Sequence, residues 1–178
     1  MALEHAILVS LSEKSATGYG LARRFDASIG HFWRATHQQI YKVLARMEEA
    51  GLVSTKLAKR DGRLDKKTYS ITPAGEQELV RWSREPSNRE VARSDFTVKL
   101  RGLADPVAMR IDAQRRRDEV AEELSAFEES RAKHHPDPAE LSGKKLGSYL
   151  ALLGGIHYAQ ADLAWCDEIL ARLSSEEH

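Results

Sequence analysis

The chain has 178 residues, of which 42% are hydrophobic and 30% charged, a composition that fits one or two globular domains and excludes a disordered chain. Its formal net charge is zero, and its single cysteine, Cys166, excludes an intramolecular disulfide framework. No apolar run approaches the ~20 residues of a membrane span, and the first residues lack the pattern of a signal peptide, so we expect a cytoplasmic protein.

The balanced charge hides an asymmetry along the chain. Residues 1–83 hold 13 Lys/Arg against 9 Asp/Glu, whereas residues 84–178 hold 14 against 18. Within residues 34–67 the count is 9 basic to 4 acidic. A local basic patch is typical of a surface that binds phosphate, although a highly charged surface can also be uneven by chance.

Three helices are expected in the first third of the chain. Apolar residues at helical spacing predict helices over residues 3–11 and 19–30, separated by a turn at Gly18. A third helix follows Thr36, a residue suited to the N-cap, and stops at Gly51, a residue suited to the C-terminal cap.

A β-hairpin and a fourth helix complete this part. Residues 52–58 and 67–72 have strand-forming composition, and the polar residues between them favour a turn. Thr72 and Pro73 predict the start of a helix that runs to Trp82. The order helix, helix, helix, hairpin, helix is that of a winged helix-turn-helix, which we assign to residues 1–84.

A polar linker over residues 85–94 is expected to precede an all-helical domain over residues 95–178. There we predict a short helix over 94–102 and two long antiparallel helices over 105–134 and 141–173. Their apolar sides are expected to hold these residues: Val107, Ile111, Val120, Leu124 and Phe127 in the first, and Leu146, Leu150, Leu153, Ala161, Trp165, Ile169 and Leu173 in the second. Because two helices cannot enclose a core, we expect a second copy of the chain to cover the remaining stripe. The residues expected at this dimer contact are Leu146, Leu150, Leu153, Gly154, His157, Ala161 and Trp165.

The third helix has the polar pattern of a DNA recognition helix. With Ile40 facing the core, the opposite face presents Gln38 and Lys42, flanked by Gln39 and Arg46. Gln can pair with adenine, and Lys or Arg can reach guanine or phosphate. The alternative is an ordinary solvated helix in a protein-interaction module, since Gln and Lys also favour helices.

The hairpin favours DNA over that alternative. Five basic residues cluster at its tip, where stability does not require them: Lys59, Arg60, Arg63, Lys66 and Lys67. Each can attract a phosphate oxygen and so increase the salt dependence of binding.

The motifs "HQQIYKVLARMEEAGLV" and "GRLDKKTYSITPAGEQEL" resemble those of the PadR family of bacterial transcriptional regulators. "ILVSLSEKSATGYGLARRF" is similar to that family's first two helices, and the C-terminal helical hairpin is similar in pattern to its longer subfamily. Residues 36–38 are Thr-His-Gln where many members have Ser-Pro-Gly, so base preferences cannot be transferred from those members.

The resemblance implies a homodimeric regulator, usually a repressor, that a small aromatic or otherwise hydrophobic compound releases from a pseudo-palindromic operator. It also implies that Tyr41 contacts the DNA backbone. The full set of expected DNA contacts is Thr36, His37, Gln38, Gln39, Tyr41, Lys42, Arg46, Arg60, Arg63, Lys66, Lys67 and Tyr69.

Three tryptophans are candidates for an effector pocket, namely Trp33, Trp82 and Trp165, because aromatic walls suit flat apolar ligands. A tryptophan is more often simply a core or interface residue. Two consecutive glycines at 154 and 155, inside a helix, indicate a close crossing with a partner helix, room for a ligand, or a kink. We find no catalytic constellation and no metal-ligand spacing among the histidines, so we expect neither an enzyme nor a cofactor.

Overall fold

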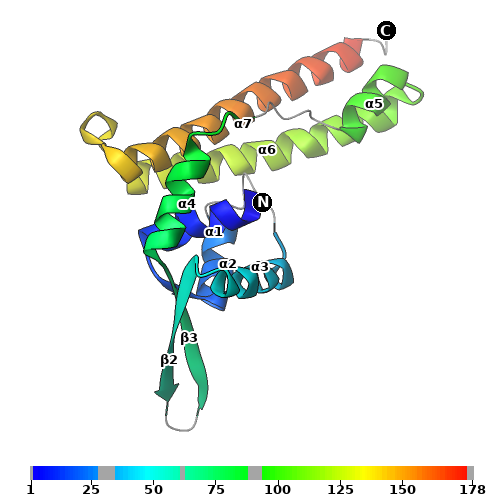
Figure 1. Cartoon of the computed structure of the whole chain (residues 1–178). Coiled ribbons are helices and arrows are strands. Elements are labelled where there is room, and N and C mark those ends of the chain that lie inside the picture. The colour runs from blue at the N-terminus through cyan, green and yellow to red at the C-terminus, as the bar shows by residue number, and fades with distance from the viewer. Residues whose placement is uncertain (1, 28–34, 61–62, 88–93, 176–178) are drawn as a thin grey trace. The chain divides into compact units, whose positions relative to one another are not determined.

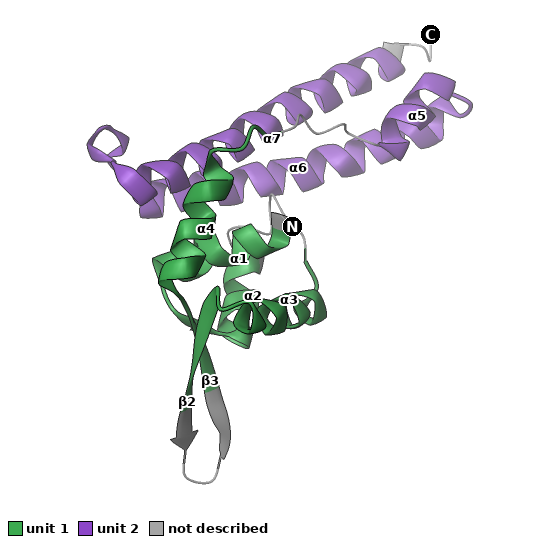
Figure 2. Cartoon of the chain, viewed as in Figure 1, with its two compact units in different colours: residues 1–89 green, residues 90–178 purple. Residues whose placement is uncertain are grey.

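The computed structural model describes residues 2–27, 35–60, 63–87 and 94–175, without the side chains of residues 2, 26–27, 58–60, 63–66 and 175. The chain forms two compact units, residues 1–89 and 90–178 (Figure 2). The predicted fold class, mainly α-helical with a small β-structure, is confirmed.

In its described residues, unit 1 contains four helices and a small antiparallel sheet (Figure 1). The elements are α1 (Ala2–Glu13), β1 (Ala16–Thr17), α2 (Gly18–Ala27), α3 (His37–Glu49), β2 (Val53–Arg60), β3 (Arg63–Ile71) and α4 (Pro73–Ser83). The sheet order is β1-β3-β2, so the hairpin gains a third strand that the sequence analysis did not predict. β1 is only two residues long, too short for an alternating pattern to reveal it; Ala16 pairs with Tyr69, and Thr17 with Thr68.

One apolar core joins the helices of unit 1 to the base of the sheet. Its fully buried side chains include Ile7 and Leu8 of α1, Leu21 and Phe25 of α2, and Leu44 of α3. The β2–β3 hairpin, which we call the wing, extends away from these helices as a ribbon (Figure 1). The core therefore fixes the base of the wing and the inner face of α3.

The ends of α3 follow from its sequence. Thr36 accepts a hydrogen bond from the backbone N–H of Gln39, and the Gln39 side chain accepts one from the backbone N–H of Thr36, which forms a capping box. At the other end Gly51 has φ of +70°, while its N–H donates to Glu48 O and that of Leu52 donates to Met47 O. This Schellman motif stops the helix and turns the chain into β2.

All regular structure in the described residues of unit 2 is helical. It comprises α5 (Asp95–Gly102), α6 (Pro106–His134), a short 3-10 turn (Pro138–Glu140) and α7 (Gly143–Ser175). The long helices α6 and α7 lie side by side and antiparallel (Figure 1). Buried contacts form two clusters, one of Phe96, Met109, Ala113 and Leu173, the other of Val120, Phe127, Ile156 and Ala159.

The predicted buried faces of the two long helices are correct in part, since Val120 and Phe127 of α6 and Leu173 of α7 are buried. Val107 and Ile111 of α6 are 54% and 64% exposed, whereas Met109 is buried. On α7, Leu150 and Trp165 are 54% and 37% exposed, and Ala161 is also exposed. Among its described side chains, α7 also buries Gly155, Ile156, Ala159 and Cys166, which were not predicted. Because α7 is apolar on two sides, its periodicity does not reveal which side faces α6.

Candidate nucleic-acid interface

Helix α3 separates a buried apolar side from an exposed polar side. Ile40, Val43, Leu44 and Met47 are buried. The exposed side chains are His37, Gln38, Gln39, Tyr41, Lys42, Ala45, Arg46 and Glu49. The predicted recognition face is thus the solvent face of the helix, as DNA contact requires.

Two of the predicted contacts also build the helix start. Thr36 is the N-cap, and the side-chain oxygen of Gln39 accepts the Thr36 N–H at 2.8 Å. The capping box uses this oxygen and thereby fixes the direction of the Gln39 side chain. Gln38 and Lys42, one turn apart, remain on the exposed face.

Tyr41 is held by a close approach to the first residue of α2. A Cβ atom added at Gly18 would lie 2.2 Å from Cε1 of the Tyr41 ring. Gly18 therefore leaves room for the ring, which is 47% exposed at the edge of the recognition face. The absence of a side chain at residue 18 allows this position of Tyr41.

Arg46 lies further along the same face and interacts with α1. Its guanidinium nitrogen is 3.6 Å from a carboxylate oxygen of Glu4, and the Arg46 side chain is 56% exposed. Exposed pairs at this distance add little to stability, so the guanidinium can exchange Glu4 for a phosphate.

The base of the wing is joined to the end of α3 by Glu48. Thr55 of β2 donates to one Glu48 oxygen at 2.6 Å, and Lys67 of β3 donates to the other at 2.7 Å. These bonds hold the pKa of Glu48 below its usual value, the bond from Lys67 first. The same bond raises the pKa of Lys67, so both groups stay charged at neutral pH.

Tyr69, predicted as a DNA contact, is 7% exposed and belongs to the core of unit 1. The Lys67 amine lies 5.2 Å from the centroid of its ring. Packing therefore accounts for Tyr69, and we remove it from the candidate contacts. The side chains of Arg60, Arg63 and Lys66 lie outside the described part of the structure.

The tryptophans proposed for an effector site have separate surroundings. Trp33 lies outside the described residues. In unit 1, Trp82 stacks on the buried His5 ring, with 4.4 Å between centroids and 9° between planes. His5 in turn donates to Glu78 at 2.9 Å.

In unit 2, Trp165 packs edge-on against Phe96 at 5.5 Å between centroids. The Arg116 guanidinium lies 5.0 Å from the Phe96 centroid and 5.7 Å from that of Trp165. It donates twice to the carboxylate of Asp162, at 3.1 and 2.6 Å. Burial raises the pKa of the neighbouring Cys166 thiol and so disfavours the reactive thiolate.

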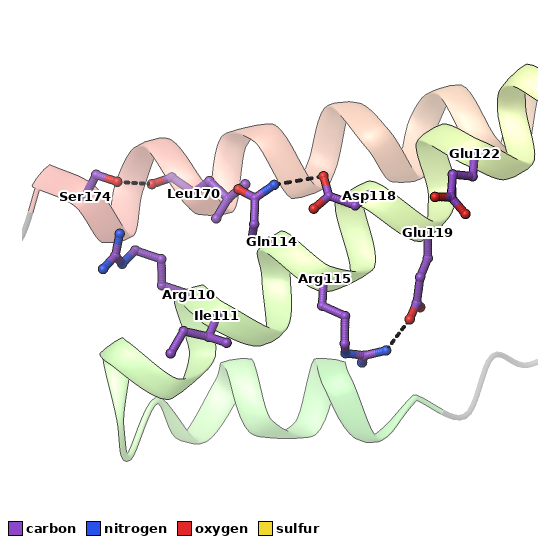
Figure 3. A pocket seen from close by; sticks show the side chains of 9 residues that line it. All are labelled: Arg110, Ile111, Gln114, Arg115, Asp118, Glu119, Glu122, Leu170 and Ser174. Carbon is purple, nitrogen blue, oxygen red and sulfur yellow. Dashed lines mark hydrogen bonds and ion pairs between the residues drawn. The ribbon is translucent and has the colours of Figure 1, made fainter.

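A groove of about 650 Å³ lies on α6 and α7 (Figure 3). Ile111 and Leu170 supply its apolar wall, and it is otherwise lined by Arg110, Gln114, Arg115, Asp118, Glu119, Glu122 and Ser174. Neither described tryptophan is among these residues. Its many charges suit a polar molecule better than the flat apolar ligand expected from the sequence.

The predicted dimer residues form one stripe on α7. Taking 100° per residue, they cover the side of α7 opposite the residues that pack on α6. Leu150, His157, Ala161 and Trp165 are exposed, while Leu146, Leu153 and Gly154 are half-buried. We call this set the open stripe.

The glycine pair divides between the two sides of α7. A Cβ atom at Gly155 would lie 3.1 Å from Cζ of Phe127 on α6, whereas one at Gly154 would meet nothing within 4 Å. The predicted close crossing is thus present at Gly155, but within the chain. Gly154 remains on the open stripe.

Three contributors were missed by the sequence analysis, namely Glu48, His5 and the contact between Gly18 and Tyr41. An acidic residue in the last turn of a helix opposes the helix dipole, and this was the one signal that could have indicated a partner for Glu48. His5 and the Gly18–Tyr41 contact depend on tertiary packing and have no local signal.

Among the described residues, no cluster of three or more metal-ligating side chains occurs. Within the same described ranges, no helix has the length and apolar character needed to cross a membrane.

Comparison with known proteins covers both units. A model of the PadR-like family of transcriptional regulators matches residues 7–81, and one for the C-terminal part of virulence activator alpha matches residues 92–174. A probable transcriptional regulator of Mycobacterium tuberculosis is 40% identical, over 99% of this chain and 100% of its own length. The negative transcriptional regulator PadR of Bacillus subtilis is 26% identical over 98% of each chain.

Solved structures agree with these matches. The virulence activator AphA of Vibrio cholerae has a TM-score of 0.76 and 33% identity, covering 98% of this chain and 99% of its own. Bacillus subtilis PadR in complex with operator DNA has a TM-score of 0.83 and 26% identity, covering 97% and 99%. The same protein in complex with p-coumaric acid has a TM-score of 0.77 and 25% identity, covering 98% and 99%. The chain belongs to the PadR-like family of DNA-binding transcriptional regulators.

Proposed function

We propose that this regulator is a homodimer that binds a pseudo-palindromic operator, represses transcription from it, and is released by a small aromatic or hydrophobic compound. The observation that supports DNA binding most directly is the exposed face of α3, where Gln38, Lys42 and Arg46 lie opposite a fully buried apolar side. A helix of this kind, held on a rigid core and followed by a wing, fits the major groove.

The residues have different roles in this proposal. Gln38 and Lys42 contact base edges, since Gln suits adenine and Lys suits guanine. Arg46 and Tyr41 hold the backbone beside the groove, together with His37 at the helix start. Arg60, Arg63 and Lys66 of the wing add phosphate contacts that make binding sensitive to salt.

Dimerisation is supported by the open stripe. Leu150 and Trp165 expose large apolar surface on a helix whose other side is already packed on α6. A second copy of the chain would cover this surface and set two recognition helices about one or two DNA turns apart.

Repression and release are supported by relatives. Bacillus subtilis PadR is named a negative regulator and has been solved with p-coumaric acid. The Vibrio cholerae relative is named an activator, so this architecture also serves activation. We assign repression here because a dimer on an operator within a promoter blocks polymerase without needing a further contact surface.

The test uses a duplex of about 30 base pairs that the wild-type chain enriches from a random library, which we call the selected duplex. Replacing Lys42 and Arg46 by Ala should weaken its binding at least about 100-fold, because base and phosphate contacts at the centre of the recognition face are lost. The matched control is Lys144→Ala with Lys145→Ala, which removes the same charge from the exposed start of α7. Undiminished binding by the α3 double variant would contradict the assigned recognition face.

A further inference from the structure

Glu48 occupies a position that is unfavourable for the helix alone. It lies in the last turn of α3, where the backbone carbonyl groups carry partial negative charge. Its neighbour Glu49 shares this disadvantage, but only Glu48 has polar partners on the wing in the described part of the chain. Those partners stabilise the carboxylate at Glu48.

The partners lie on both strands of the wing. Thr55 belongs to β2 and Lys67 to β3, and each uses a different oxygen of the same carboxylate. Thr55 pairs with Tyr69 and Leu57 pairs with Lys67, so the four residues share one face of the hairpin. The bridge therefore ties α3 to this face of the wing across both strands.

Lys67 is directed by a second contact as well. Its amine lies 2.7 Å from Glu48 and 5.2 Å from the centroid of Tyr69, whose ring is buried in the core. The amine keeps its full charge, but the Glu48 carboxylate beside it offsets that charge, so the pair attracts a phosphate less strongly than a lysine without an acidic neighbour. The geometry of Lys67 thus differs from that of a lysine without such neighbours.

We propose that Glu48 is a positioning residue for DNA binding, which sets the angle between the recognition helix and the wing through Thr55 and Lys67. The proposal rests on the proposed function, since an angle between two DNA-contacting elements matters only if both contact DNA. Lys67 acts in it as the partner of Glu48 and not as a phosphate contact.

General electrostatics and the positioning role predict opposite effects of Glu48→Gln on the affinity for DNA. Removing a negative charge near DNA tightens binding by general electrostatics. Loss of the bridge should instead weaken binding to the selected duplex by about threefold to tenfold, because wing and helix no longer meet the DNA together. Glu49→Gln removes the same charge from the adjacent residue and is the matched control; it should bind as tightly as wild type or tighter.

The role of Lys67 as the partner of Glu48 is tested with Lys67→Met and with the double variant Glu48→Gln/Lys67→Met. If the two residues act as a pair, the double variant binds no more weakly than either single variant. The salt dependence of Lys67→Met should also equal that of wild type, whereas loss of a phosphate contact would lower the log–log slope by about 0.9. Thermal unfolding of each variant checks that weaker binding does not result from loss of the fold. If Glu48→Gln fails to fold, the DNA affinity of Lys67→Met tests the proposal independently.

Three results would overturn the proposal. The first is a Glu48→Gln variant that binds as tightly as Glu49→Gln. The second is a reduced salt slope for Lys67→Met together with additive losses in the double variant. The third is a wild-type chain that enriches no duplex from the random library. That result would contradict the proposed function itself, and it can be distinguished from the other two because it is obtained without any variant.

Discussion

Glu78 joins α1 to α4 through two neighbours of different kinds. Arg81 donates to both of its oxygens, at 2.6 and 2.7 Å, and His5 donates at 2.9 Å. These bonds, the one from Arg81 first, lower the pKa of Glu78 to about 2. The carboxylate is therefore charged in the folded protein far below the pH at which an exposed glutamate is protonated.

This depressed pKa predicts a loss of stability in acid. Because the folded pKa lies below the unfolded one, the stabilisation is present above about pH 4.5 and is lost as the pH falls toward about 2. Glu78→Gln should lower the free energy of unfolding at neutral pH and make it less dependent on pH in this window. Urea unfolding of the wild-type chain and of Glu78→Gln at several pH values measures this free energy. If the free energies of unfolding of the two proteins change with pH in parallel, the role assigned to Glu78 is contradicted.

Local capping signals made the ends of α3 and α4 predictable from single residues. Thr36, Gly51 and Thr72 all have the expected capping roles. Gly75 was not predictable, since only the structure shows that a Cβ atom there would lie 2.2 Å from the carbonyl oxygen of Leu52. The bridge at Glu48 was missed for the same reason, because its partners come from strands 7 and 19 residues further along the chain.

Gly154 and Gly155 lie on different sides of helix α7, and their surroundings differ. Gly155 faces the Phe127 ring of α6, and Gly154 faces away from it. Alanine is a better helix former than glycine by about 1 kcal/mol at either position. Only at Gly155 does the added methyl group meet an aromatic ring, at 3.1 Å.

The two alanine variants should therefore differ in stability. We expect Gly155→Ala to be less stable than Gly154→Ala by about 1–3 kcal/mol, since overpacking at the α6–α7 contact offsets the gain in helix propensity. Chemical denaturation of the two variants under identical conditions tests this. Equal stabilities would show that the Phe127 ring moves aside without cost.

At the level of elements, the sequence predicted the helices, the wing and their order, because caps, turns and periodicity are local. It missed β1, whose pairing with β3 is set by tertiary packing. It also gave the wrong buried face for Val107 and Ile111. On α7, apolar residues surround much of the helix, and the face that meets α6 is decided by the partner helix rather than by the pattern.

For the whole molecule, the open stripe on α7 gives the test of assembly. Leu150→Glu places a charge in the middle of the stripe and should convert a dimer to a monomer, because burying an unpaired carboxylate in an apolar contact is unfavourable. Binding to the selected duplex should fall with it, since one half-site is held more weakly than two.

The matched control is Ala151→Glu, which adds the same charge to the next exposed residue, 100° around the helix and off the stripe. Light scattering coupled to gel filtration measures the mass of both variants. A dimeric Leu150→Glu variant would contradict the assignment of the stripe, and a monomeric Ala151→Glu variant would show that the contact is wider than the stripe.

The family and its two-part organisation followed from sequence motifs, because the residues that form the core and caps of a winged helix recur in a fixed order. The site was predictable only in part. The exposed side of α3 follows from its period, but the use of Gln39 in a capping box, the burial of Tyr69 and the pairing of Lys67 with Glu48 depend on neighbours that the sequence does not place.

Fluorescence anisotropy of the wild-type chain with the DNA upstream of its own gene, against a scrambled duplex over about 50 to 200 mM salt, tests sequence-specific DNA binding most directly. We predict a preference of about 10³-fold or more for the upstream DNA, with affinity falling steeply as salt rises. Equal and weak binding to the two duplexes would contradict control of its own promoter, and no binding even at low salt would contradict DNA recognition by α3 altogether.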